Sequence, residues 1–177
     1  MAGHNKWSKI KHKKAVTDAR KSKIFGKLVR LIQVEARLAN GDVDAPGLRM
    51  AIEKARKENM PNDNIERAIK KASESGADMS SVTFETYGPG GVGIIIEGLT
   101  DNNNRTSAEI KHILSKHNTE LAAQGAVSWN FTKDKSNNEW TPNMTLDISD
   151  QDLEKLGTLV DALEDHDDVQ DVFTNAS

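Results

Sequence analysis

Apolar residues in the first part of the chain recur at helical spacing. They predict a first helix that starts near residue 15 and ends at Asn40-Gly41, a pair typical of a helix C-cap. A second helix is expected from Pro46 to about Glu58, and a third after Pro61. Three amphipathic helices can cover one another's apolar faces, so the pattern predicts a small helical bundle.

Beyond the small polar residues 73–81, apolar and polar positions alternate as in strands. Val82–Tyr87 and Val92–Gly98 are expected to form a hairpin. The later expected elements are a helix from about Asn104, a strand with Val127, Trp129 and Phe131 on one side, a strand with Met144, Leu146 and Ile148, a helix with Leu153, Leu156, Val160 and Leu163, and a strand Val169–Phe173. The order ββαβ-βαβ predicts an α+β fold, in which a three-helix domain precedes an α/β sheet domain.

We therefore expect two domains. Residues 1–76 would form a basic helical domain with a mobile N-terminal arm, and residues 81–177 an acidic α/β domain. Residues 132–143 are polar and lack periodicity, so they are expected to form a loop between two strands of the second domain.

The distribution of charge separates the two halves. The chain holds 24 Lys and Arg and 27 Asp and Glu, a net charge of −3. Up to Met79, however, 18 basic residues face 10 acidic ones, whereas the remainder holds 6 basic and 17 acidic residues. The first 30 residues contain ten Lys and Arg and a single acid, Asp18. Such an asymmetry favours a polyanionic partner for the basic half.

The composition excludes several classes of protein. The chain has no cysteine, so disulfides, cysteine-based zinc fingers and thiol catalysis are ruled out. No apolar run approaches the roughly 20 residues that cross a bilayer, and no secretory signal is evident. We expect a cytoplasmic protein that does not bind membranes; an alternative is that the Lys-rich start is an organelle transit peptide.

The candidate nucleic-acid-binding residues lie mainly in the arm and in the first helix, where Lys and Arg can neutralise phosphates. Trp7 could stack on a base or pack on the protein. Arg105, at the start of the helix after the hairpin, could contact a ligand or pair with Asp101. The full set is Lys6, Trp7, Lys9, Lys11, His12, Lys13, Lys14, Lys21, Lys23, Lys27 and Arg105.

The sequence offers little support for catalysis, a metal or a cofactor. The glycine-rich 87–93 lacks the following helix and Lys of a phosphate loop, and its Pro89-Gly90 pair suits a type II turn. His112 and His117 fall about 140° apart on a helix, which is poor for a shared metal. The acidic stretch 164–171 lacks the EF-hand pattern and is expected to be a solvated turn. We therefore expect no enzyme, no small-molecule substrate and no cofactor.

Four stretches together resemble the YebC/PmpR family, which includes the mitochondrial translational activator of cytochrome c oxidase. They are AGHNKWSKIKHKKAVTDARKSKIFGKL, NMPNDNIERAIKKA, YGPGGVGIIIEGLTDNNNRT and DALEDHDDVQDVFTN. The resemblance implies a cytoplasmic, non-enzymatic regulator associated with nucleic acid, with a helical N-terminal domain followed by α/β domains. It assigns the nucleic-acid role to the arm residues, and less strongly to Lys21, Lys23 and Lys27.

The chain departs from this family in length. Members look as if they carry a further α/β domain between the strands expected to end near Phe131 and to begin near Met144. In this chain only residues 132–143 fill that gap. The sequence therefore predicts a short form of the family.

The leading hypothesis is a transcriptional regulator that binds DNA through its basic N-terminal region. An alternative is a ribosome-associated translation factor that binds ribosomal RNA, because phosphate contacts carry no sequence information. A second alternative is a protein-interaction module without nucleic acid. The sequence leaves the oligomeric state open.

Overall fold

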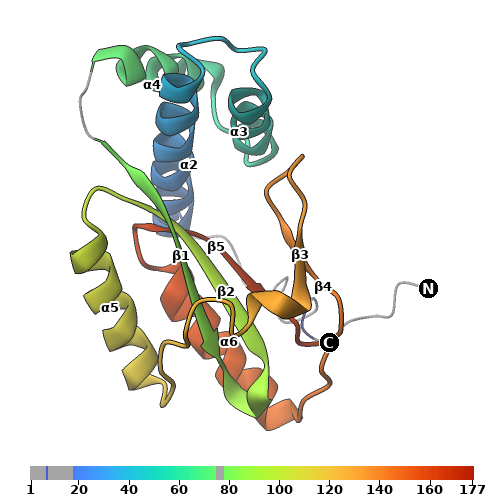
Figure 1. The fold of residues 1–177 in the computed structure, drawn as a ribbon. Helices are drawn as coiled ribbons and strands as arrows, with labels where there is room; N and C mark the ends of the chain where they lie inside the picture. The colour runs from blue at the N-terminus through green and yellow to red at the C-terminus, as the bar shows by residue number, and fades with distance from the viewer. Residues whose placement is uncertain (1–6, 8–17, 75–77) are drawn as a thin grey trace. The chain divides into compact units, whose positions relative to one another are not determined.

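The structure is a computed structural model that describes Trp7, residues 18–74 and residues 78–177. The described residues form two compact units (Figure 1). One unit is helical and extends to Ser80; the other contains Ser81–Ser177 together with Trp7. A helical N-terminal region followed by an α/β sheet region confirms the predicted fold class.

The helical unit consists of α2 (Asp18–Leu38), α3 (Pro46–Lys57) and α4 (Asn62–Glu74). The long helix α2 packs against both α3 and α4, and their facing apolar side chains form one core. Its buried members are Leu28, Ile32, Ala36, Leu48, Ala51, Ile52, Ala55, Met60, Ile65, Ala68 and Ala72. The three helices expected from the apolar periodicity are therefore confirmed.

The predicted end of the first helix is also confirmed. Asn40 and Gly41 both have positive φ, at 50° and 81°, and the amide of Gly41 donates to the carbonyl of Ala36 at 2.8 Å. This hydrogen bond satisfies a carbonyl that has no partner inside the helix, as in a Schellman motif. A non-glycine residue at position 41 would be strained in this conformation.

The α/β unit is built on a three-stranded sheet in the order β1-β2-β5. Its strands are β1 (Ser80–Tyr87), β2 (Gly93–Thr100) and β5 (Val169–Thr174), and β5 pairs antiparallel with β2. Because β2 is the central strand, side chains on both of its faces are buried, which explains its unbroken apolar run.

The turn between β1 and β2 has the geometry that its sequence predicts. Gly91 donates its amide to the carbonyl of Gly88 at 3.0 Å, and Gly90, the third residue of the turn, has φ 72° and ψ 6°. These values are those of a type II turn with Pro89 at its second position. The glycine-rich stretch is thus a hairpin turn.

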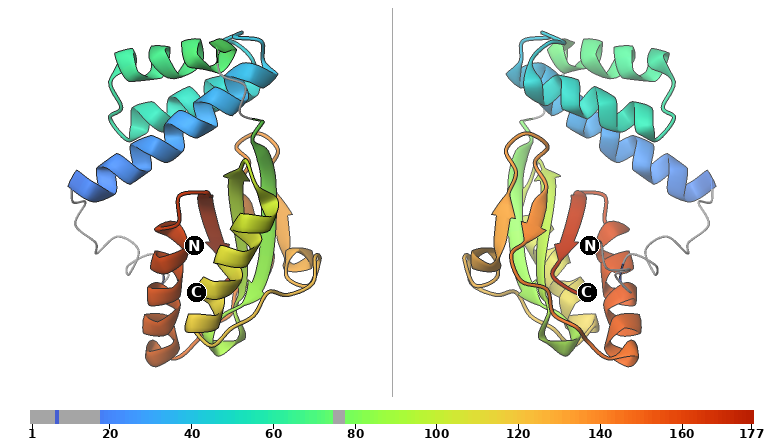
Figure 2. Two further views of the ribbon diagram at one scale, coloured as in Figure 1. Left: turned by 90° about the vertical axis from the view of Figure 1, so that its left-hand side faces the viewer. Right: turned by 90° about the vertical axis from the view of Figure 1, so that its right-hand side faces the viewer.

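The two faces of the sheet carry different partners (Figure 2). Helices α5 (Asn103–Lys116) and α6 (Asp150–Glu164) cover one face and share a core with Ile94 and Ile96. On the other face Ile95 packs with residues from a small hairpin of β3 (Phe131–Lys133) and β4 (Trp140–Pro142). Along the chain, the helices and strands of this unit follow the predicted order ββαβ-βαβ.

Two of the predicted strands lie at the wrong place. Residues 128–130 form a 3-10 turn, η2 (Ser128–Asn130), so the predicted strand through Val127 and Trp129 is wrong; β3 begins only at Phe131. The predicted strand at 144–148 is also wrong, because Leu146 makes only an isolated bridge with Ala176. The expected loop 132–143 instead forms the β3-β4 hairpin.

Alternation over five residues does not distinguish a strand from an extended segment. At Met144, side-chain amides take the place of a neighbouring strand. Met144 donates its amide to Asn130 Oδ1 at 3.0 Å, and Asn130 Nδ2 and Asn175 Nδ2 both donate to the Met144 carbonyl. The amide and the carbonyl of Met144 are thereby satisfied although this residue belongs to no sheet.

None of the helices in the described part of the chain is both long and apolar enough to cross a membrane.

Candidate nucleic-acid interface

Helix α2 carries a basic stripe, defined as Arg20, Lys23, Lys27 and Arg30. At about 100° per residue, these four positions fall within about 80° of one another and opposite the buried Leu28 and Ile32. All four side chains are exposed or half-buried. The helix has no acidic residue between Asp18 and Glu35. The packing of α2 on α3 and α4 therefore turns a row of positive charge outward.

Two of the predicted first-helix residues, Lys23 and Lys27, belong to this stripe. Lys21 is exposed but falls on a different side of α2, about 100° from Arg20. Arg20 and Arg30 were not among the predicted site residues. Their helical spacing from Lys23 and Lys27 is the signal that could have identified them.

Most of the predicted arm residues lie outside the described residues. They are Lys6, Lys9, Lys11, His12, Lys13 and Lys14. Their assignment to nucleic-acid binding stays a prediction.

Trp7 is described, and its side chain packs against the apolar core between the sheet and the helices α5 and α6. It is half-buried in that position. Of the two alternatives that the sequence left open for Trp7, the structure shows packing on the protein.

Arg105 lies in a network of acidic groups at the start of α5. Its Nη2 donates to Asp101 Oδ1 at 2.8 Å and to Asp168 Oδ2 at 2.9 Å, and its Nε lies 3.9 Å from Glu109. The hydrogen bonds to Asp168 and Asp101 raise the pKa of the Arg105 guanidinium above its ordinary value. Arg105 thus pairs with Asp101, which was one of the two alternatives from the sequence. It also pairs with Asp168, which no pattern in the sequence indicated.

Asp168 was expected to lie in a solvated turn, and this expectation is wrong. Its side chain is buried and accepts hydrogen bonds from Arg105 and, at 2.7 Å, from the hydroxyl of Thr106. The Thr106 hydroxyl oxygen also lies 2.7 Å from the hydroxyl oxygen of Thr100 at the end of β2. A charged residue in an acidic run gives no local sign of burial, because its partners come from a helix more than 60 positions away.

Among the described residues, Glu109, His166 and Asp168 bring possible metal-ligand atoms within 4.8 Å of one another. Here the Arg105 guanidinium supplies the positive charge, since it contacts both carboxylates, while His166 Nε2 is 2.8 Å from Glu109. A divalent cation would have to displace or face this guanidinium. The arrangement is an ion-pair network that joins α5 to the turn before β5.

A second buried carboxylate holds the loop that precedes η2. Glu85 on β1 is 4% exposed and accepts backbone amides of Gly125, Val127 and Ser128 at 2.7 to 2.9 Å. Burial alone would raise the pKa of Glu85, but these hydrogen bonds outweigh it and lower the pKa below the ordinary value. Glu85 thus fixes the backbone on which Trp129 is presented.

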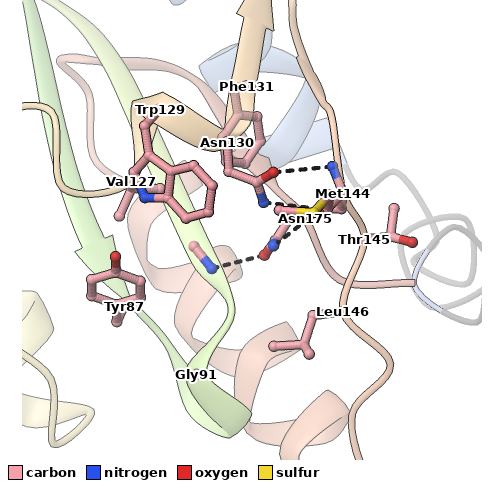
Figure 3. A pocket seen from close by; sticks show the side chains of 11 residues that line it. Tyr87, Gly91, Val127, Trp129, Asn130, Phe131, Met144, Thr145, Leu146 and Asn175 are labelled. Atoms are coloured by element: carbon pink, nitrogen blue, oxygen red, sulfur yellow. Dashed lines mark hydrogen bonds between the residues drawn. The ribbon is translucent and has the colours of Figure 1, made fainter.

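A pocket of about 300 Å³ opens beside this loop (Figure 3). We call it the aromatic pocket and define it by its lining residues: Tyr87, Gly91, Gly93, Val127, Trp129, Asn130, Phe131, Met144, Thr145, Leu146 and Asn175. Asn175 is buried and accepts the amide of Gly93 at 2.8 Å, so it ties the segment at Met144 to the central strand. Sequence reasoning did not predict this pocket, because its walls come from four separate segments.

Comparison with known families decides the classification. Residues 5–75 match the TACO1/YebC protein N-terminal domain, and residues 79–136 and 132–176 match the TACO1/YebC second and third domain. The chain belongs to the TACO1/YebC family. The predicted family membership is confirmed.

Two relatives in this family are each 38% identical to the chain over the aligned positions. A probable transcriptional regulatory protein of Desulfosudis oleivorans is 38% identical over 238 positions, covering 100% of this chain and 97% of the relative. One from Thermotoga petrophila is 38% identical over 236 positions, covering 99% and 93%. Because this chain has 177 residues, these relatives contain residues that it lacks.

A solved structure shows a similar fold. The crystal structure of a conserved hypothetical protein from Aquifex aeolicus matches with a TM-score of 0.81 at 34% identity. The match covers 97% of this chain and 96% of the other.

Proposed function

We propose that this member of the TACO1/YebC family is a non-enzymatic regulatory protein, a transcriptional regulator that binds DNA through its basic N-terminal region. The observation that carries the proposal is the concentration of positive charge in the first 30 residues, which α2 continues as an outward-facing stripe. The names of the relatives, probable transcriptional regulatory proteins, support it.

The binding mode that we propose is neutralisation of backbone phosphates. Arg20 and Arg30 lie about 15 Å apart along α2, at 1.5 Å per residue. Several phosphates of a duplex fall within that length, because each strand places one every 3.4 Å. The arm residues would add contacts beyond the end of the helix. The α/β unit has an excess of acidic residues, so we expect the side chains of residues 81–177 to contribute few phosphate contacts.

Phosphate contacts alone do not distinguish DNA from RNA. Ribosome-associated translational regulation, with ribosomal RNA as ligand, is therefore the alternative that the test must separate. We propose a cytoplasmic location for either function.

The test is a salt series of fluorescence anisotropy with a DNA duplex, a structured RNA of equal phosphate number and intact ribosomes. The stripe variant Lys23→Ala/Lys27→Ala/Arg30→Ala and the arm variant Lys9→Ala/Lys11→Ala/Lys13→Ala/Lys14→Ala should each bind less tightly. Each lost phosphate contact on duplex DNA should reduce the slope of log affinity against log salt by about 0.9. Lys111→Ala/Lys116→Ala on α5 is the matched control, which should bind as the wild type does.

The results assign the ligand. Tighter binding to the DNA duplex than to RNA and ribosomes supports the transcriptional proposal, and the reverse order supports the translational one. Binding that is weak and insensitive to salt for all three ligands would defeat both.

A further inference from the structure

The helices α2, α3 and α5 end in the same way. Each is followed by an exposed Asn with positive φ: Asn40 at 50°, Asn59 at 59° and Asn118 at 57°. At each end the amide of the next residue donates to the carbonyl five positions earlier, at 2.8 to 3.0 Å. All three ends are therefore Schellman motifs with the same backbone geometry, and they differ in the residue that follows the Asn.

The following residue is anchored at two of these ends. Met60, after Asn59, is 4% exposed and packs in the core of the helical unit. Thr119, after Asn118, donates its hydroxyl to the carbonyl of Tyr87. Gly41 is exposed and has no side chain that could make such a contact. Because helix ends open locally at low free-energy cost, the end of α2 should open most readily of the three.

An opened end allows a reaction between Asn40 and Gly41. The backbone nitrogen of Gly41 can then attack Cγ of the Asn40 side chain, an intramolecular step that needs no second molecule. The new N–Cγ bond forms, the Cγ–Nδ2 bond breaks, and ammonia leaves with the proton of the Gly41 amide. Water then opens the resulting succinimide ring at one of its two carbonyls, which yields aspartate or isoaspartate. A glycine offers the least steric hindrance to the attack, because no side chain stands beside its nitrogen.

We propose that Asn40 is a site of spontaneous deamidation and that the reaction weakens the C-terminal end of α2. Asn40-Gly41 is the only Asn-Gly pair in the sequence. Either product places a carboxylate at a helix C-terminus, where the macrodipole is already negative. Isoaspartate also lengthens the main chain by one carbon, so the amide of Gly41 loses its alignment with the carbonyl of Ala36.

The reaction can be followed by peptide mass spectrometry of the folded protein kept in mildly alkaline buffer, with isoaspartate methyltransferase as the probe for isoaspartate. Acid should accumulate at Asn40 at least about tenfold faster than at Asn59 or Asn118, because a following side chain and its anchoring each raise the barrier. The rate should rise with pH, since the attacking nitrogen must lose its proton. The two other helix ends thus serve as controls within the same molecule.

A transplanted pair tests the role of the following residue. Thr119→Gly creates a second Asn-Gly pair in the same motif and should make Asn118 reactive. The circular dichroism spectrum of this variant should match that of the wild type, which shows that the reaction occurs in a folded chain. A folded Thr119→Gly variant in which Asn118 stays as slow as in the wild type would contradict the proposed chemistry.

The effect on the helix end can be measured with Asn40→Asp, which reproduces one of the products. This variant should lower the melting temperature by a few degrees, and wild-type protein after long incubation should show the same decrease. Asn138→Asp is the matched control, because Asn138 is also exposed, has φ 60° and lies between β3 and β4, away from any helix end. Its melting temperature should equal that of the wild type.

Two results would overturn the proposal. One is acid at Asn40 that accumulates no faster than at Asn59 and Asn118; the other is a wild-type melting temperature for Asn40→Asp. Arg30 precedes Asn40 by ten residues, about 15 Å along the helix, so Asn40→Asp should bind duplex DNA as tightly as the wild type does. Failure here would therefore leave the phosphate contacts proposed for α2 untouched.

Discussion

Arg105 and Asp168 are joined by a 2.9 Å ion pair across 63 positions of the chain. Arg105 lies in the first turn of α5, and Asp168 lies in the turn between α6 and β5. The backbone carbonyl of Asp168 also accepts the amide of Leu99 on β2 at 2.8 Å. This one acidic residue thus connects the helix, the turn and the central strand.

Asp168→Asn should lower the free energy of unfolding by about 1–3 kcal/mol, because a buried acceptor loses its charge while Thr106 still needs a partner. Arg105→Ala should destabilise the fold in the same direction, since it leaves the Asp168 carboxylate with one fewer donor. Urea denaturation followed by circular dichroism measures both changes. If Arg105→Ala instead weakened nucleic-acid affinity while stability stayed at the wild-type value, Arg105 would be a ligand contact after all.

Glu85 should make the free energy of unfolding depend on pH in the acidic range. Its pKa is lowered in the folded state, so the unfolded carboxyl, with an ordinary pKa of about 4.3, takes up a proton first as the pH falls. The stabilisation is present above that value and is lost as the pH falls toward the lower folded pKa.

Glu85→Gln should therefore cost about 1–3 kcal/mol at neutral pH, because an amide offers only one acceptor oxygen to three backbone amides. The variant should also lose this part of the acid dependence in urea titrations between neutral pH and pH 3. Glu120→Gln, at an exposed position, is the control and should follow the wild-type curve. Parallel pH curves for Glu85→Gln and the wild type would contradict the assigned role.

Two glycines should respond in opposite directions to alanine. At Gly98 a Cβ would lie 2.7 Å from the backbone oxygen of Asp168, so Gly98→Ala should destabilise the fold by about 1–3 kcal/mol. At Gly26, inside α2, a Cβ meets nothing within 4 Å. Gly26→Ala should therefore stabilise the helix by about 0.5–1 kcal/mol. Thermal denaturation of the two variants measures both changes. Equal shifts of the melting temperature would argue against the close approach at Gly98.

Trp7→Ala should lower the stability of the α/β unit by about 1–2 kcal/mol, because its half-buried ring packs on the core. Trp7→Phe should recover part of the loss. The affinity of the folded variant for single-stranded RNA should change little, whereas loss of a stacked base would cost about 1–3 kcal/mol of binding. Fluorescence titrations measure both the unfolding of the variants and their affinity for single-stranded RNA. Unchanged stability together with weakened RNA binding would instead support stacking of Trp7 on a base.

Much of the fold could be predicted because its signals are local. Helical periodicity, the Asn40-Gly41 cap and the Pro89-Gly90 turn each depend on neighbouring residues, and all three are present in the structure. The strand prediction that failed lies where backbone groups are satisfied by side chains distant in the sequence. Asn130 and Asn175 hold Met144 in place of a strand, and no pattern within residues 144–148 reveals this.

Local patterns and composition are enough to establish the helices, the hairpin, the division of charge between the halves and the family resemblance, because each depends on composition or on residues close in the chain. The packing of the fold buries Asp168, places Trp7 on the α/β core and brings four exposed apolar residues to one pocket. These relationships join residues far apart in the chain, whose proximity depends on how the sheet and helices pack.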